Sequence, residues 1–188
     1  DGKTSVTVNA AAIKNIEGTA TAVKAAYDAN ALKTISGLGN ETVDLSAATD
    51  ANASLVKAIN DYTTGLITLP TITFDKGTTA TPTTFSLSEL GDLNGITGLA
   101  KIDAENGEVD TISISLKDLL AANDGKGNIT FAITGDDSGT DSVTFTDVSG
   151  WIKNDSAYDG TTDTGNIVFT NSTTNKEVTI VLTDVIYA

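Results

Sequence analysis

Apolar residues recur at helical spacing in two segments of the first third of the chain, residues 18–32 and 50–65. Thr19 stands just before the first apolar face, where a helix N-cap is expected. The second segment carries an apolar stripe made of Leu55, Val56, Ile59 and Tyr62. The pattern therefore predicts two helices. They share the tripeptide VKA and a helix-then-strand plan, which is a weak internal repeat.

Apolar and polar residues alternate with a period of two in most of the remaining chain, which predicts strands. Residues 66–75 form one such strand, interrupted by Pro70. In "TISISL", residues 111–116, we expect one buried and one exposed face. Ile112 and Ile114 would point inward, and the outward set would be Thr111, Ser113 and Ser115. A short helix is expected to follow, with Ser115 as its cap.

Turn residues between the later strands predict two hairpins. "ITFAITG" and "DSVTFTD" flank "DDSGT" and are expected to pair with each other. Residues 165–185 are expected to form a second hairpin around residues 171–175. Trp151 lies between these two pairs and is expected to fill part of the core.

These elements predict a mainly β protein with a small α/β N-terminal part and a β-sandwich-like C-terminal part with short helices. The Thr-rich segment "KGTTATPTTFS" is the best candidate for a linker. We therefore predict a helix/strand, repeat-like part at residues 1–75, a linker at 76–86 and a β-rich module at 87–188. The sequence leaves open whether the two parts share one core.

The charge of the chain limits its partners. The net charge is −14, and each of the 11 basic residues is a lysine. Nucleic-acid binding requires clustered cations to displace counterions from phosphate, so we exclude that class. No apolar run approaches the roughly 20 residues that span a bilayer, and membrane insertion is not expected. An acidic surface attracts cations, especially Ca²⁺, although acidic residues also serve simply to keep a protein soluble.

The chain contains no Cys, no His and no Met. Thiol catalysis, disulfides and Ser-His-Asp machinery therefore cannot be built from it alone. Paired carboxylates remain the main catalytic option, as in glycoside hydrolases. The scarcity of aromatic residues, 5% of the chain, disfavours a sugar-cleaving groove, so we expect no enzymatic activity.

Acidic residues gather in two loops that are candidate Ca²⁺ sites. The first loop, in "DAENGEVD", supplies Asp103, Glu105, Glu108 and Asp110. Counted from Asp103 as a helix–loop–helix calcium loop, position 5 is Gly107 and position 12 is Ile114, so that motif fails. An irregular calcium loop and a solvated turn before a strand both remain open, and we favour the turn.

The second loop, in "GDDSGTDS", supplies Asp136, Asp137 and Asp141. Carboxylates in one turn repel each other unless solvent or a cation screens them. A weaker third cluster contains Asp159, Asp163 and Asn166. The glycine- and aspartate-rich nonapeptide of calcium-binding β-rolls does not occur.

Two segments resemble known bacterial surface proteins. "IEGTATAVKAAYDANALKTISGLGNETVDLS", with the later "DYTTGLITL", is similar to Ala/Thr-rich repeats of surface-layer and haemolysin-type calcium-binding proteins. The part from "FSLSELGDLNGITGLAKIDAENGEVDT" to "IVFTNSTTNKEVTIVLTD" resembles a C-terminal module of type I-secreted RTX adhesins and surface-layer proteins. Its landmarks come in order: a line "I-D-x-x-N-G-x-x-D-T", a "G-D-x-x-D-S-V" turn, "G-W" and a final hairpin.

The resemblance implies an extracellular, structural or adhesive role on the bacterial cell surface. It implies self-assembly with copies of the chain or with neighbouring modules of a parent protein, with Ca²⁺ at acidic turns. The alternative is a ligand-binding domain of an RTX-type adhesin that recognises a cell-surface glycan or receptor. That alternative predicts a concave site rimmed by Trp151, Tyr158 and acidic groups.

Overall fold

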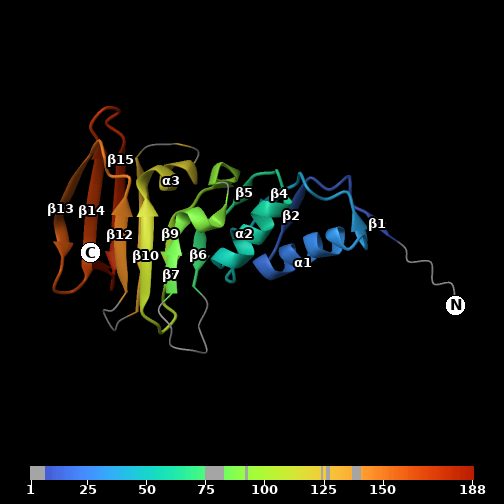
Figure 1. Cartoon of the computed structure of the whole chain (residues 1–188), viewed down its shortest axis with the longest axis horizontal. Helices are drawn as coiled ribbons and strands as arrows, with labels where there is room; N and C mark the ends of the chain where they lie inside the picture. Colours follow the sequence, from blue (N-terminus) through green and yellow to red (C-terminus); the bar gives the residue numbers. More distant parts are fainter. Residues whose placement is uncertain (1–6, 75–82, 92, 124, 126–127, 137–140) are drawn as a thin grey trace.

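The computed structural model describes residues 7–74, 83–91, 93–123, 125, 128–136 and 141–188. The described part is mainly β, which confirms the predicted class, and it contains three α-helices. The chain forms an elongated molecule whose strands follow one another from the N-terminal to the C-terminal end (Figure 1). The helices are α1 (Ala20–Ala31), α2 (Ala53–Tyr62) and α3 (Leu116–Ala121), with short 3-10 turns η1 (Leu87–Leu90) and η2 (Leu93–Gly95).

The described strands form three larger sheets and one short ladder, and most neighbouring strands run parallel. The short ladder pairs β1 (Val8–Asn9) with β3 (Ile35–Ser36). The N-terminal sheet has the order β2 (Asn15–Glu17), β4 (Thr42–Asp44), β5 (Ile67–Thr68) and β8 (Ile96–Thr97).

The other two sheets draw most of their strands from the C-terminal half of the chain. The six-stranded sheet has the order β13 (Trp151–Asp159), β14 (Thr164–Asn171), β15 (Glu177–Thr183), β11 (Ile129–Thr134), β9 (Lys101–Asp103) and β6 (Thr71–Thr73). The C-terminal four-stranded sheet has the order β16 (Ile186–Tyr187), β12 (Ser142–Thr146), β10 (Asp110–Ser115) and β7 (Thr83–Ser86).

The order of elements along the chain makes this arrangement a solenoid. The chain visits the three sheets in turn through β5, β6 and β7, and then again through β8, β9 and β10. Each coil therefore lies on the previous one, and all pairs between successive coils are parallel. Such stacking is typical of repeat proteins, in which each unit contacts mainly its neighbours.

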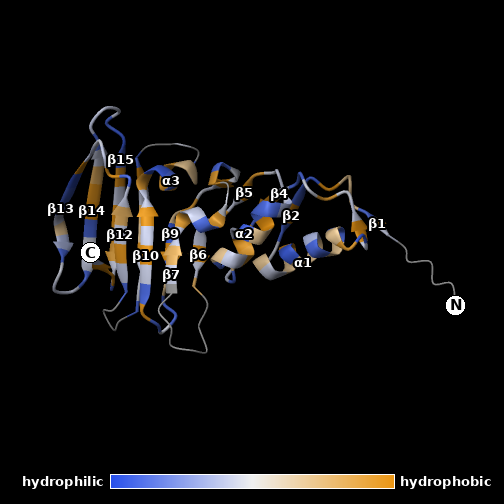
Figure 2. Cartoon of the chain, in the orientation of Figure 1, coloured by the Kyte–Doolittle hydropathy of each residue, from blue (hydrophilic) through white to orange (hydrophobic). Residues whose placement is uncertain are grey.

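In-register apolar residues explain why the coils stack. Val43, Ile67 and Ile96 pair in sequence across the N-terminal sheet and are all buried. A second buried column crosses the six-stranded sheet through Ile72, Ile102, Ile133 and Leu182. Since parallel pairing places identical positions side by side, each column removes a continuous apolar strip from water. Figure 2 shows the resulting alternation of apolar and polar residues along β10.

Both predicted helices of the first third are confirmed. Thr19 caps α1, because its side chain accepts a hydrogen bond from the Ala22 N–H at 3.2 Å. In the same way Asn52 caps α2 through the Leu55 N–H at 2.9 Å. Pro70 separates β5 from β6, so the predicted interruption is a corner between two sheets.

One predicted hairpin is confirmed and the other is wrong. β14 and β15 pair antiparallel, as expected for residues 165–185. β11 and β12 do not pair with each other in the described part, because β11 pairs with β9 and β15 while β12 pairs with β10 and β16. The segment between them therefore joins strands of two different sheets, and residues 137–140 of the expected turn lie outside the described part. The buried residues of β11 and β12 lie in register with the buried residues of β9 and β10 in the previous coil. This register favours parallel pairing with those strands over a hairpin.

In β10, Ile112 and Ile114 are buried and Thr111 is exposed, as predicted. Ser115 differs from the prediction, because it is 8% exposed and its hydroxyl donates to Asp147 at 2.7 Å. Ser115 does cap α3, through the Asp118 N–H. The capping role turns its side chain back into the structure.

The proposed division at residues 76–86 stays a prediction, and residues 75–82 lie outside the described part. Strands on its two sides pair directly, β5 with β8 and β6 with β9. Among the described residues, none of the helices has the length and apolar character needed to cross a membrane.

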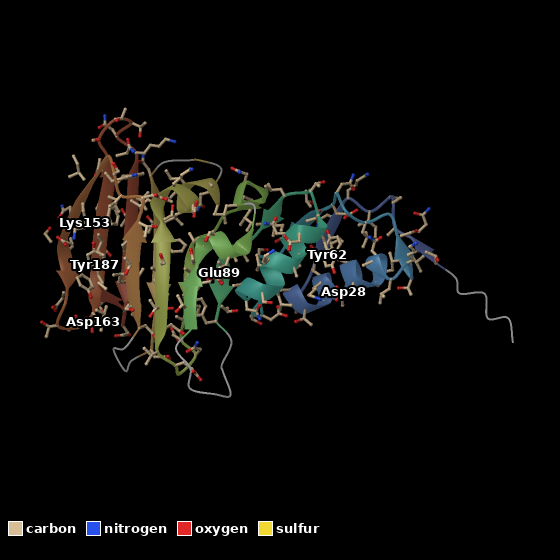
Figure 3. The ribbon with its side chains drawn as sticks, in the orientation of Figure 1. Asp28, Tyr62, Glu89, Lys153, Asp163 and Tyr187 are labelled. Carbon is tan, nitrogen blue, oxygen red and sulfur yellow. The ribbon has the colours of Figure 1, made fainter. Side chains whose placement is uncertain are left out.

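The antiparallel hairpin β13–β14 forms the C-terminal end of the six-stranded sheet. Lys153 of β13 lies 4.6 Å from the ring centre of Tyr187 and donates to its hydroxyl at 3.1 Å (Figure 3). Tyr158 packs edge-on against the same ring. β13 itself is largely exposed.

Candidate functional site

The two acidic loops predicted from the sequence meet at one corner of the solenoid. Residues 104–109 connect β9 to β10, and residues 135–141 connect β11 to β12. Since β9 pairs with β11 and β10 pairs with β12, both in parallel, the described residues of the second loop, Gly135, Asp136 and Asp141, lie against the first loop. We call this region the acidic corner.

Asp141 joins the two loops. One carboxylate oxygen accepts the Asp110 N–H and the other accepts the Asp136 N–H, both at 2.8 Å. The side chain is fully buried, and its backbone carbonyl accepts the Ile186 N–H of the following coil. Asp141 therefore links three successive coils, through its carboxylate and its backbone carbonyl, by accepting hydrogen bonds from main-chain N–H groups.

The side chains of Asp136 and Asn106 complete these contacts. The Asp136 carboxylate accepts the Gly107 N–H at 2.7 Å, from the loop of the previous coil. The buried amide of Asn106 donates to Asp110 at 2.9 Å, while its oxygen accepts the Glu108 N–H. The carboxylates thus serve mainly as acceptors for backbone amides, which stabilises the two loops against each other.

The remaining predicted residues lie at the edge of this corner or outside the described part. Asp103 lies 3.4 Å from the Lys101 ammonium and accepts from Thr134 at 3.4 Å. Glu105 is exposed and Glu108 is half-buried. Asp137 lies outside the described residues.

The third acidic cluster does not assemble around one point. Asp159 accepts the Thr161 N–H within its own turn. Asp163 accepts from the Tyr158 hydroxyl at 3.3 Å, and the same hydroxyl reaches the Val185 carbonyl. These contacts secure the β13–β14 turn to the end of the chain.

Burial sets the electrostatics of the acidic corner. Desolvation raises the pKa of Asp141 above its ordinary value. The hydrogen bonds from the Asp136 and Asp110 N–H groups oppose this rise, and the negative charge of Asp136 adds to it. A group with a raised pKa is more easily neutralised in the folded than in the unfolded chain.

The described carboxylates do not fit a ready-made calcium site. Ca²⁺ takes six to eight oxygen ligands, whereas both oxygens of Asp141 already face N–H groups. No group of three or more acidic residues in the described ranges is placed to hold a metal ion. A cation here would have to displace backbone donors or use residues outside those ranges, so Ca²⁺ stays a prediction.

Sequence patterns missed two residues that shape this corner. Asn106 belongs to a stretch whose composition predicts a solvated turn, yet its side chain is buried against Asp110. Gly135 leaves no room for a side chain, because a Cβ there would lie 2.4 Å from the Asp184 carbonyl and 2.5 Å from the Asp141 carboxylate. The parallel register, which brings the loops together, is the signal that would have identified both.

Other hollows lie away from the acidic corner. One is lined by Ala53, Ser54, Lys57 and Glu89, and another by residues 60–65 with Gly95. Both border α2 and neither contains Trp151 or Tyr158, which both belong to β13. The chain matches no protein-family model, no curated protein and no solved structure.

Proposed function

We propose that this chain is a non-enzymatic structural module of a large secreted bacterial cell-surface protein, which contributes to assembly of a surface layer. The observation that carries the proposal is the parallel stacking of coils along one axis. A solenoid can span distance and present long side faces without a catalytic cleft. Extracellular self-assembly uses both properties.

Residue chemistry supports the same proposal. The net charge of −14 suits a solvated extracellular surface, and a chain without Cys depends on no redox compartment. The carboxylates of the acidic corner bind backbone amides, which is a structural task. The partners proposed are copies of the chain or neighbouring modules of the parent protein.

We also propose that the C-terminal part acts as a sandwich-like unit. Phe145 of the four-stranded sheet contacts Phe169 of the six-stranded sheet, with 5.2 Å between ring centres. Inward residues of both sheets belong to one apolar cluster. This packing gives the module stiffness at the end where the hairpin β13–β14 lies.

Electron microscopy of cells that produce the parent protein tests the proposed function. Antibodies against this chain are expected to label the outer surface, and a regular sheet is expected in surface replicas. Cells from which the gene has been deleted serve as the control. Labelling confined to the cell interior would contradict the proposal.

Thermal unfolding with Ca²⁺ or EDTA tests the calcium prediction separately. A cation that binds only the folded chain must raise its stability, so about 1 mM Ca²⁺ is expected to raise the melting temperature. Mg²⁺ at the same concentration controls for general screening of the acidic surface. An equal melting temperature in Ca²⁺ and EDTA would contradict calcium binding and leave the structural role in place.

A further inference from the structure

The chain contains two Asn-Gly pairs, Asn94–Gly95 and Asn106–Gly107. In such a pair the backbone nitrogen of the glycine can attack the side-chain carbonyl carbon of the asparagine, because glycine has no side chain to obstruct the approach. A C–N bond forms, the proton of the attacking nitrogen passes through solvent to the departing amide, and ammonia leaves behind a succinimide ring. Water then opens the ring to aspartate or isoaspartate. Both pairs are therefore candidate sites of deamidation.

The fold places the two pairs in different surroundings. Asn94 lies in the 3-10 turn η2 and is exposed. Asn106 lies in the loop between β9 and β10 and is only 7% exposed. Since both asparagines precede a glycine, their local sequence gives them similar intrinsic reactivity. A difference in their rates of deamidation must then come from the tertiary contacts.

Hydrogen bonds restrain each reacting group of the second pair. The side-chain amide of Asn106 donates to Asp110 at 2.9 Å, and its oxygen accepts the Glu108 N–H at 2.8 Å. The attacking nitrogen, that of Gly107, donates its hydrogen to the Asp136 carboxylate of the next coil at 2.7 Å. A carboxylate therefore holds the departing amide and another holds the attacking nitrogen. Deamidation requires both of these hydrogen bonds to break.

The Asp136 carboxylate has two possible effects on this reaction. It could accept the proton of Gly107 as a general base, which would accelerate the attack. Near neutral pH, however, a carboxylate is a weaker general base than imidazole, and the chain contains no histidine. A charge-assisted hydrogen bond, in contrast, is one of the stronger restraints available to a backbone N–H. We therefore expect the restraint to outweigh the base effect.

We propose that Asn106 is a deamidation site which the folded acidic corner protects, and which reacts when its two loops separate. Local separation of this kind needs far less free energy than unfolding of the whole chain. When opening and closing are fast compared with the chemical step, the rate follows the fraction of molecules that are open. The site depends on the contacts of the acidic corner alone and is independent of the proposed role in assembly.

Deamidation also prevents the corner from closing again. An aspartate at position 106 has no amide hydrogen to donate to Asp110. It places a second carboxylate against one that is fully buried, and like charges in a buried site repel each other. Isoaspartate in addition lengthens the main chain by one carbon next to Gly107, whose N–H meets Asp136. The reaction therefore acts as a one-way switch on the contact between the two coils.

Peptide mass spectrometry of the full chain, aged in warm and mildly alkaline buffer with and without urea, tests the protection. In urea the two asparagines are expected to deamidate at similar rates. In native buffer Asn106 is expected to react at least about tenfold more slowly than in urea, since only open molecules react. Asn94 is the internal reference in each sample. Equal rates at Asn106 in the two buffers, or no reaction there in urea, would overturn the proposal.

Variants at position 136 test the role of the hydrogen bond. Asp136→Ala is expected to raise the native rate at Asn106 at least about fivefold and to leave Asn94 unchanged, because a hydrogen bond to a charged group is lost. Asp136→Asn keeps an acceptor and should preserve most of the protection. The matched control is Asp155→Ala, in the exposed part of β13, which should change neither rate. A slower reaction in Asp136→Ala would identify Asp136 as a base and overturn the protection.

Asn106→Asp reproduces one product of the reaction and tests the one-way switch. Its midpoint of urea unfolding is expected to lie below that of the wild type, since the new carboxylate faces Asp110. Asn94→Asp makes the same change at an exposed position and is expected to shift the midpoint less. Equal midpoints for the two variants would contradict the irreversible opening. If Asp136→Ala does not fold by circular dichroism, the comparison of wild-type rates in native buffer and urea still decides whether Asn106 is protected.

Discussion

At the residue scale, we expect Asp141 to be the side chain of the acidic corner whose removal lowers the free energy of unfolding most. Asp141→Ala removes the acceptor of two N–H groups, those of Asp110 and Asp136. Each buried donor left without a partner costs about 1–3 kcal/mol, so we expect the free energy of unfolding to fall by about 2–4 kcal/mol. Urea unfolding at neutral pH measures this change.

Asp155→Ala is the matched control for that experiment. The Asp155 side chain is 48% exposed and forms an ion pair with Lys153 at 2.8 Å. Exposed pairs contribute little, so almost no change in the free energy of unfolding is expected. Equal losses in the two variants would refute the linking role of Asp141.

Asp50 illustrates the opposite response to pH. Its carboxylate accepts the N–H groups of Ala20 and Thr21 at the start of α1, at 2.7 and 3.0 Å. Burial alone would raise its pKa, but these hydrogen bonds outweigh burial and lower the pKa below its ordinary value. Its stabilisation is therefore present above the unfolded pKa and is lost as the pH falls through the folded value.

We expect Asp50→Asn to destabilise the chain by about 1 kcal/mol at pH 7, because helix N-termini favour a negative acceptor. The difference from the wild type should shrink as the pH falls below about 4. Urea unfolding at several pH values measures both quantities. If the difference in free energy of unfolding between the wild type and Asp50→Asn stayed constant as the pH fell, the stabilisation could not come from the negative charge of Asp50.

At the scale of elements, Gly65 allows β5 to approach β4. A Cβ at this position would lie 1.9 Å from the Glu41 carbonyl oxygen, and backbone cannot move aside as a flexible side chain can. We expect Gly65→Ala to lower the free energy of unfolding by more than about 3 kcal/mol. Circular dichroism and urea unfolding measure the loss.

Gly98→Ala separates steric exclusion from backbone strain. Gly98 has a φ of +77°, and a Cβ there meets nothing within 4 Å. Only the left-handed backbone should resist alanine, at about 1–2 kcal/mol. A Gly65→Ala variant no less stable than Gly98→Ala would show that the two strands can separate without loss.

Local elements were predictable from the sequence because their causes are local. The cap at Thr19 and the interruption at Pro70 involve residues close in the chain. Which strands pair with each other depends on residues that are far apart in the sequence. For example, β11 pairs with β15, although β12, β13 and β14 lie between them in the chain. Turn chemistry around residues 135–141 fits a hairpin and a corner equally well, and only register with earlier coils decides between them.

In the acidic corner, too, the local elements could be predicted from the sequence, whereas the contacts between distant residues could not. Sequence patterns identified both loops, but not that Asp141 of one would accept the N–H of Asp110 in the other. That contact follows from the parallel pairing of β10 with β12. The acidic composition suggested a bound cation, whereas the carboxylate oxygens of Asp136 and Asp141 accept hydrogen bonds from backbone N–H groups.

At the scale of the whole molecule, one continuous core joins the two predicted parts. Buried residues from α1 to β15 belong to a single apolar cluster. Pairing of β5 with β8 and of β6 with β9 adds main-chain hydrogen bonds across the proposed boundary. Units that share a core and ladders are expected to unfold together, whereas independent domains unfold separately.

Two probes at opposite ends of the molecule test this expectation. Trp151, the only tryptophan of the chain, reports on β13, while far-ultraviolet circular dichroism is weighted towards α1 and α2 of the N-terminal half. We expect the two urea transitions to coincide at one midpoint and to yield one free energy of unfolding. A truncated chain of residues 87–188 should then unfold at lower urea, because it has lost the coils on which β8 and β9 stack. Separate midpoints, with the truncated chain as stable as the Trp151 transition of the full chain, would instead establish two independent domains.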